Sequence, residues 1–119
     1  MPAPDLEALK TYTVRALDFN TVTTDQGSYP AAGGHQFRSM WTRDFCFAVP
    51  GLLTAGQFYV ARHHLQRLLD SANEDGLIPR ILDSIPSAAR VVFNTFLGQR
   101  FKAFQLPIRE PLKPEYFGE

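Results

Sequence analysis

The spacing of apolar side chains predicts two consecutive helices in the middle of the chain. Residues 42–55 are apolar on nearly every side, so we predict a helix that is buried all round and kinked at Pro50. Gly56 is a plausible end for this helix. Residues 57–71 then show the one-sided apolar pattern of an amphipathic helix. Because the break between them is so short, the two helices are expected to pack as an antiparallel hairpin.

The flanking segments add two more helices and little regular structure besides. Residues 5–18 repeat apolar side chains three or four positions apart, with Asp5 as the cap, and residues 87–97 predict a helix capped by Ser87. A β-branched run at 21–24 predicts a short strand, followed by turn-forming residues. The segment just after the hairpin is expected to be extended, and the proline-containing tail is expected to be extended or irregular. The fold class is therefore mainly α, with long irregular loops.

Composition excludes several classes of protein. Hydrophobic residues make up 45% of the chain and charged residues 20%, which is typical of a folded domain. Lys plus Arg number 12 and so do Asp plus Glu, and this zero net charge argues against a nucleic-acid binder. No secretory signal is visible, and the longest apolar run is too short to span a bilayer. We therefore expect a cytoplasmic protein without membrane contact.

Cysteine and aromatic residues each change this picture slightly. The single cysteine, Cys46, excludes an internal disulfide and lies in an apolar run, where an inert core thiol is expected. Ten of the 119 residues are Phe, and four Tyr and one Trp join them. A domain of this size buries only about 60–70% of its unfolded surface, so many rings would stay half exposed. Either the chain self-associates, or it is part of something larger.

The densest polar and aromatic cluster lies just before the apolar helix and includes Trp41, Arg43 and Asp44. A guanidinium offers five hydrogen-bond donors, and a carboxylate offers only acceptors. The hydroxyls of a sugar donate and accept, so they can use both groups while the indole stacks on the pyranose ring. His35 is a further candidate for the lining of such a site. The alternative is that Asp44 only caps the helix and that Arg43 is solvated.

These residues also carry a resemblance to a known family. The run WTRDFCFAVPGLL at 41–53, then Gly56, then Ala61 and Arg62, then DGLIP at 75–79 resembles the opening of the six-hairpin glycosidase domain. The similarity covers residues 33–83. It is closest to the amylo-α-1,6-glucosidase domain of glycogen-debranching enzymes, with glucoamylases and neutral invertases as more distant relatives.

The resemblance implies the first helical hairpins of an (α/α)6 toroid, with residues 1–119 as one partial, N-terminal piece of the domain. Trp41, Arg43 and Asp44 match the family's residues that bind the terminal sugar of an α-glucoside or related oligosaccharide. The family's catalytic acid and base lie on later helices, so by this comparison none of the carboxylates here is catalytic. No cofactor and no metal are implied.

Other candidate residues favour plainer roles. His63 and His64 are adjacent on a helix and point about 100° apart, so they cannot chelate one metal, and we expect one to face inward and one outward. Asp75 and the glycine after it indicate a turn that ends a helix. Asp83 and Glu115 are expected to be solvated loop charges.

A different class of function stays open, namely a small all-α module whose exposed aromatic face binds a protein or closes a homodimer. A non-catalytic carbohydrate-binding module would need an aromatic platform on strands, and the helical periodicity around Trp41 argues against it.

The missing catalytic pair gives the first prediction. The purified 119-residue chain is expected not to hydrolyse maltose, sucrose or isomaltose, because two carboxyl groups must flank the scissile bond of a glycoside. Release of free monosaccharide after incubation checks this. Turnover of any of the three sugars would refute the expectation.

Overall fold

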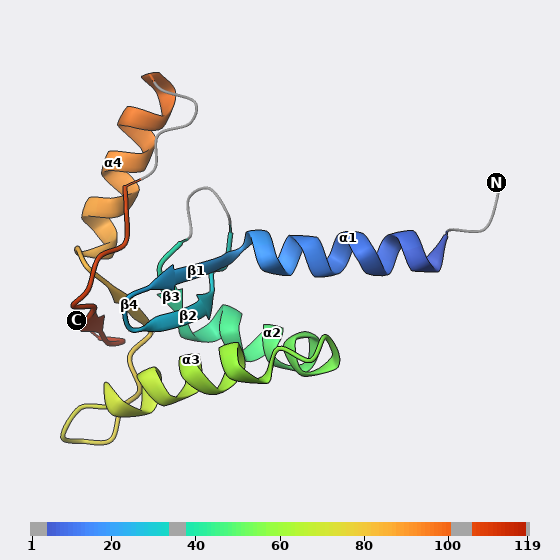
Figure 1. Ribbon diagram of the computed structural model, residues 1–119. Helices are drawn as coiled ribbons and strands as arrows, with labels where there is room; N and C mark the ends of the chain where they lie inside the picture. The colour runs from blue at the N-terminus through green and yellow to red at the C-terminus, as the bar shows by residue number, and fades with distance from the viewer. Residues whose placement is uncertain (1–4, 34–37, 101–105, 119) are drawn as a thin grey trace.

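The computed structural model describes residues 5–33, 38–100 and 106–118. Figure 1 shows two helices packed beneath two small sheets, with one helix extending to the right of this centre and another rising above it at the upper left. The described elements, in chain order, are α1 (Leu6–Phe19), β1 (Thr21–Thr24), β2 (Gly27–Pro30), β3 (Met40–Trp41), α2 (Thr42–Thr54), α3 (Phe58–Asp70), β4 (Ile81–Asp83), α4 (Ser87–Arg100) and β5 (Lys113–Glu115). The prediction of a mainly helical chain is confirmed, but two small sheets accompany the helices.

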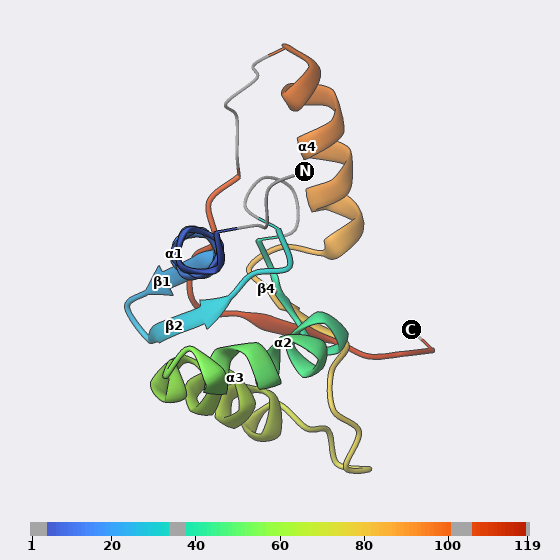
Figure 2. The same cartoon turned by 90° about the vertical axis from the view of Figure 1, so that its right-hand side faces the viewer.

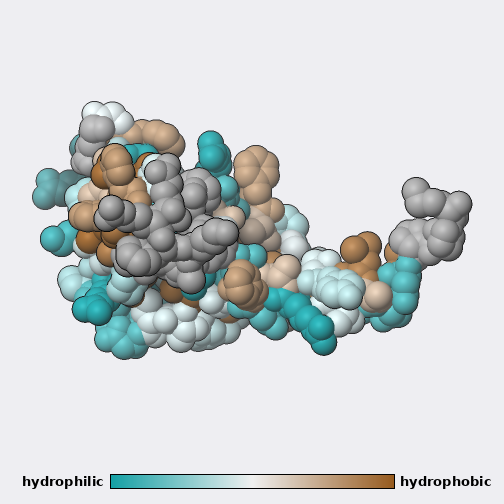
Figure 3. Space-filling view, turned by 90° about the horizontal axis from the view of Figure 1, so that it is seen from above, coloured by the Kyte–Doolittle hydropathy of each residue, from teal (hydrophilic) through white to brown (hydrophobic). Residues whose placement is uncertain are grey.

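Helix α1 begins where its cap was predicted. The Oδ1 atom of Asp5 accepts hydrogen bonds from the backbone N–H groups of Glu7 and Ala8, each at 3.1 Å. None of the helix's residues is buried. Figure 3 shows α1 extending away from the body of the molecule, with hydrophobic residues on its surface. Apart from Leu17, which packs against the core, its large apolar side chains therefore lack the packing that usually stabilises an amphipathic helix.

The predicted strand β1 pairs with a second strand, β2, that the sequence did not predict. The antiparallel register runs from Thr21 opposite Pro30 to Thr24 opposite Gly27. Gly27 has a φ of +130°, and a Cβ there would lie 2.5 Å from the His63 ring of α3. Position 27 therefore requires glycine for two reasons, namely the positive φ and the close approach of the β1–β2 hairpin to α3.

Helices α2 and α3 form the predicted hairpin, in which α3 runs back alongside α2 (Figure 2). Gly56, with a φ of +75°, lies in the connection as expected. Helix α2 continues through Pro50 without interruption. The prediction that α2 is buried on all sides is wrong: only Phe45 and Leu52 are buried, and Cys46 is exposed rather than in the core. The apolar run covers the whole circumference, but the described residues pack against one side of it.

The second sheet joins three segments that are far apart in sequence. Its order is β3–β4–β5, with both pairs antiparallel. Trp41 lies opposite Ile81, which in turn lies opposite Glu115. The tail, predicted to be extended or irregular, is extended at β5, and its Pro114 stands at an edge where a missing N–H is tolerated.

The core lies between the α2–α3 hairpin and the two sheets. Its buried members come from nearly every central element, and Met40, Leu52 and Leu82 have no exposed surface at all. The cluster consists of Val22, Tyr29, Met40, Phe45, Leu52, Ala61, Leu68 and Leu82. Because it draws on both sheets and both helices, this cluster fixes how the segments before α2 and after α3 meet.

An ion pair is buried beside this core and corrects the expectation for Asp83. The pair joins Asp83, whose side chain is 2% exposed, to Arg90, whose side chain is 4% exposed. Arg90 donates from Nε and Nη2 to the two carboxylate oxygens, at 2.5 and 2.6 Å, and the Ser39 hydroxyl donates to the same carboxylate. Burial alone would raise the pKa of Asp83, but the hydrogen bonds from Arg90 and Ser39 outweigh it and lower that pKa. Asp83 is thus a buried structural anion and not a solvated loop charge.

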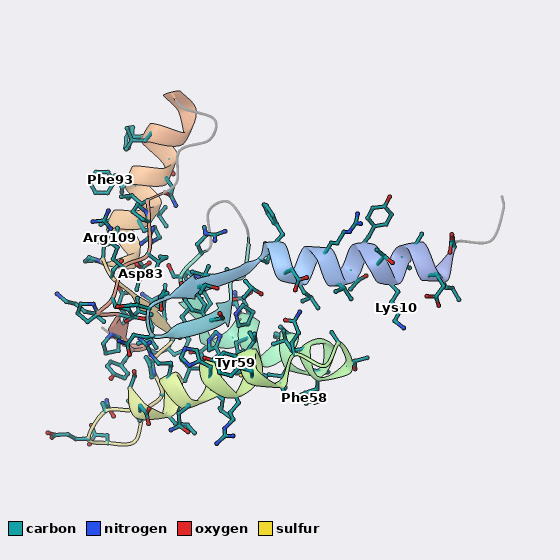
Figure 4. All side chains as sticks on the ribbon, in the orientation of Figure 1. Lys10, Phe58, Tyr59, Asp83, Phe93 and Arg109 are labelled. Atoms are coloured by element: carbon teal, nitrogen blue, oxygen red, sulfur yellow. The ribbon has the colours of Figure 1, made fainter. Side chains whose placement is uncertain are left out.

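Figure 4 places Asp83 where the base of α4 meets the three-stranded sheet, while Phe93 points outward from α4. The radius of gyration is 15.8 Å, against about 13.5 Å expected for a compact chain of this length. The projecting α1 and α4 account for this extended shape (Figure 1). None of the described helices has both the length and the apolar character that crossing a membrane requires.

The buried ion pair gives the second prediction. Replacing Arg90 by Met should lower the free energy of unfolding by about 3–5 kcal/mol, because the Asp83 carboxylate is left buried and unpaired. The double variant Arg90→Met/Asp83→Leu should recover most of the loss, since no charge is then stranded. Urea unfolding followed by circular dichroism measures both, with the exposed Arg62→Met as the control. A loss no larger than that of the control would show that the pair contributes nothing to stability.

Candidate functional site

A pocket of about 510 Å³ lies where the two sequence motifs meet. One wall comes from the end of β3 and the first turn of α2, and the other from the segment that enters β4. The residues that line it are Trp41, Thr42, Arg43, Ile78, Pro79, Arg80 and Phe117. The sequence had singled out the WTRD and DGLIP segments separately. The structure places parts of both on one concave surface.

Thr42 holds the two walls together. Its hydroxyl donates to the carbonyl of Pro79 at 2.6 Å, and its backbone N–H donates to the carbonyl of Arg80 at 3.1 Å. Trp41, one residue earlier, pairs with Ile81 across the sheet. Sequence reasoning did not assign a role to Thr42, although it is the second residue of the WTRD segment. Only the partner strand shows that this hydroxyl sets the distance between the walls.

The turn before the second wall is as predicted. Asn73 accepts a hydrogen bond from the N–H of Leu77 through its side chain, at 2.9 Å, and from that of Gly76 through its carbonyl, also at 2.9 Å. Gly76 has a φ of +82°, which favours glycine. This turn reverses the chain after α3 and delivers Pro79, which is fully buried, to the pocket floor.

Arg43 and Asp44 lie on different sides of the start of α2. Arg43 is exposed and lines the 510 Å³ pocket, whereas Asp44 lines a neighbouring pocket of about 320 Å³ beside Ala31 and Phe47. Successive helical residues point about 100° apart, which explains the divergence. Within the described parts of the chain, neither side chain has a hydrogen bond or an ion pair. The position of Trp41 as N-cap, without a side-chain cap bond, also excludes Asp44 as the cap.

The two guanidinium groups of the pocket differ in their pairing. Arg80 forms an ion pair with Glu115 at 2.9 Å. The same carboxylate accepts from the backbone N–H of Ser87 at 2.7 Å and from its hydroxyl at 2.6 Å. Glu115 is therefore not a solvated loop charge, and it caps α4 in place of Ser87, which is the first helical residue. Arg43 is left as the pocket's cation that no described carboxylate neutralises.

Trp41 stands at the junction of strand and helix. It ends β3 and precedes the first residue of α2, so the helical periodicity that argued against an aromatic platform on strands does not include Trp41. Together with Phe117 it gives the pocket two aromatic side chains, and Ile78 adds aliphatic surface. The pocket thus offers hydrogen-bond donors, aromatic faces and apolar walls, which is a chemistry that suits a ring bearing hydroxyl groups. His35, the remaining sequence candidate, lies outside the described residues.

The two adjacent histidines do not form a metal site, and no group of three His, Cys, Asp or Glu side chains among the described residues is placed to hold a metal. His64 faces inward and is fully buried. Its ring stacks on Phe45 with 4.0 Å between centroids and meets Tyr29 edge to face at 5.9 Å. His63 is partly buried over the β1–β2 hairpin and stacks on Tyr59. The prediction that one histidine faces inward is confirmed by His64. His63, the one expected to face outward, is partly buried.

Comparison with known proteins agrees with this geometry. A family model described as amylo-alpha-1,6-glucosidase matches residues 12–97, more than half of the chain. The chain belongs to the amylo-α-1,6-glucosidase family. The match covers both motif segments of the pocket and ends before β5. No curated protein and no solved structure gives a significant match.

Membership of the amylo-α-1,6-glucosidase family confirms the resemblance that the motifs carried. It relates this chain to glycoside hydrolases. The matched range includes both the α2–α3 hairpin and the hydrogen bond from Thr42 to Pro79. Phe117, which lines the same pocket, and Glu115, which pairs with the pocket residue Arg80, lie beyond the matched range.

The buried histidine gives the third prediction, which concerns pH. Burial, followed by the charges of His63 and Arg67, lowers the pKa of His64 to about 3 from its usual 6.5. In the unfolded chain His64 is therefore protonated as the pH falls through about 6.5, whereas in the folded chain it stays neutral at this pH. Stability should fall as the pH drops below 6.5, by up to about 1.4 kcal/mol per pH unit. Urea unfolding between pH 7 and 5 measures this slope before most carboxylates titrate.

The control is His64→Phe, which keeps an aromatic ring against Phe45 and removes the titrating group. Burial also lowers the pKa of His63, so a smaller slope of the same sign should remain in this variant. Equal slopes in the parent and in His64→Phe would show that His64 does not resist protonation.

Proposed function

We propose that this chain supplies sugar-binding residues to a glycoside hydrolase that acts on α-glucosides or related oligosaccharides. The observation that carries the proposal is the pocket shared by the two motif segments, in which Trp41 and Arg43 stand together. Family membership supports the substrate class, since the matching family is described as amylo-alpha-1,6-glucosidase.

In this proposal, a terminal glucosyl ring lies against Trp41 and the aliphatic side chain of Ile78. Arg43 donates to its hydroxyls, and each hydrogen bond to a charged group is worth about 1.5–3 kcal/mol. The Arg43 guanidinium is available because no described carboxylate pairs with it, whereas Arg80 is paired with Glu115. Asp44 keeps a proposed role as acceptor for hydroxyls that extend into the neighbouring pocket.

The proposal assigns binding to this chain and the acid–base pair to other residues. An inverting glycosidase needs two carboxyl groups about 6.5–9.5 Å apart across the sugar. Among the described residues, those that line the 510 Å³ pocket include no carboxylate. Glu115, which approaches it through Arg80, is engaged by three hydrogen bonds.

We further propose that α2 and α3 are one hairpin of a larger (α/α)6 toroid. The antiparallel packing of the two helices supports this, as does the apolar outer face of α2, where Phe47 is 82% exposed. Further helices packed on that face would bury it.

A second candidate function, association with another protein or with a second copy, has its own observation. Helices α1 and α4 expose apolar side chains far from the pocket, among them Leu6, Tyr12, Phe93 and Phe96, which are 49–70% exposed. Exposed apolar patches of this kind often mark interaction sites.

The fourth prediction separates the two functions. Arg43→Ala should weaken binding of isomaltose by about 10- to 150-fold, the equivalent of one lost charged hydrogen bond. Trp41 is the only tryptophan, so its fluorescence reports binding in the pocket directly. Arg62→Ala removes the same charge from the exposed face of α3 and should bind as the parent does.

Asp44→Asn, with the exposed Asp75→Asn as its control, tests the second polar residue in the same way. Sedimentation velocity on all variants should show unchanged self-association. If the parent self-associated and the Arg43 and Asp44 variants bound isomaltose no more weakly than the parent, the interaction module would replace the sugar-binding proposal.

A further inference from the structure

The pocket has a side wall that lies outside the family match. Phe117 lines the pocket together with Trp41 and Arg43, yet the family match ends at residue 97. The wall therefore comes from the C-terminal segment, which reaches the pocket only because β5 joins the sheet next to β4.

Three contacts hold this segment against the pocket. The N–H of Arg80, a residue of the pocket, donates to the carbonyl of Glu115 at 2.8 Å. The Glu115 side chain binds the guanidinium of Arg80 and the start of α4 at Ser87. The hydroxyl of Tyr116 donates to the carbonyl of Ser71 at the end of α3, at 2.6 Å. The residues just before Phe117 are thus fixed to β4, α4 and α3.

The Phe117 ring itself is not packed into the core. It is 81% exposed, although the residue before it is anchored and only partly exposed. A large aromatic ring held at the rim of a pocket, with most of its surface in water, gains by being covered. A flat ring with an apolar face can cover it and contact Trp41 in the same pocket.

We propose that Phe117 is a specificity-determining residue of this pocket, a second aromatic wall that contacts the saccharide ring beside Trp41. The inference rests on the proposed sugar-binding function and deepens it. It assigns part of the recognition of an α-glucosyl ring to the C-terminal segment, which Arg80 and Glu115 couple to the motif region.

The test uses the full chain and isomaltose, with the fluorescence of Trp41 as the readout. Phe117→Ala should weaken isomaltose binding by about two- to tenfold, the range expected for losing one aromatic contact. Phe117→Tyr keeps the ring and should bind within about twofold of the parent by the same reasoning. Phe19→Ala removes another highly exposed phenylalanine, 72% exposed and away from the pocket, and should have no effect.

A second readout needs no sugar. If Phe117 walls the pocket, its removal should make Trp41 more accessible to the neutral quencher acrylamide, while the urea midpoint stays unchanged because the ring is exposed. Phe19→Ala should leave the quenching as it is.

The binding results test the role of Phe117 and the proposed sugar-binding function separately. Equal isomaltose binding by the parent, Phe117→Ala and Phe19→Ala would overturn the role of Phe117 and leave the proposed function standing. A parent chain that does not bind isomaltose or maltose would overturn the proposed function, and this inference with it.

Discussion

The buried ion pair between Asp83 and Arg90 is the constraint on which the arrangement of the chain depends. It ties the end of β4 to the first turns of α4, and through Ser39 it also reaches the residue before β3. Arg90 donates further to the carbonyl of Leu106 at 2.7 Å, so the returning C-terminal segment is bound as well. Separating these two charges would be costly, because each would then be buried without a partner. The three-stranded sheet is built around this pair.

The pocket follows from the same sheet. Once β3 and β4 are paired, Thr42 bridges the first turn of α2 to the Pro79–Arg80 backbone, and the two motif segments become opposite walls. Once β5 is paired to β4, Glu115 neutralises Arg80 and leaves Arg43 as the group whose donors are available. The electrostatic character of the site is therefore set by a residue from the end of the chain. One guanidinium without a carboxylate partner, beside aromatic and aliphatic surface, suits a neutral polyhydroxyl ring better than a strongly charged ligand.

Much apolar surface stays uncovered on the outer helices. The outer face of α2, most of α1 and one side of α4 are exposed, although their sequences have the periodicity of packed helices. Burying one phenylalanine side chain stabilises a fold by about 1.5–3 kcal/mol. The exposed rings do not contribute this free energy in the described structure. Covering them by further helices or by a second copy would have a large effect on stability. The pocket is independent of this surface, because its walls are held by backbone hydrogen bonds and ion pairs.

Local patterns were sufficient for features that depend on neighbouring residues. The four helices, the Asp5 cap, the turns at Gly56 and Gly76, and the hairpin all follow from periodicity and backbone chemistry, and the WTRD and DGLIP segments identified the family. Contacts between distant segments decided the rest. Strands β2 and β5 have weak propensity and form because Tyr29 and Glu115 find partners elsewhere. The burial of Asp83, the exposure of Cys46 and the divergence of Arg43 from Asp44 likewise depend on which surfaces meet. Sequence specifies the local conformations, but a charge is buried or solvated according to the side chains that folding brings against it, and those come from residues far along the chain.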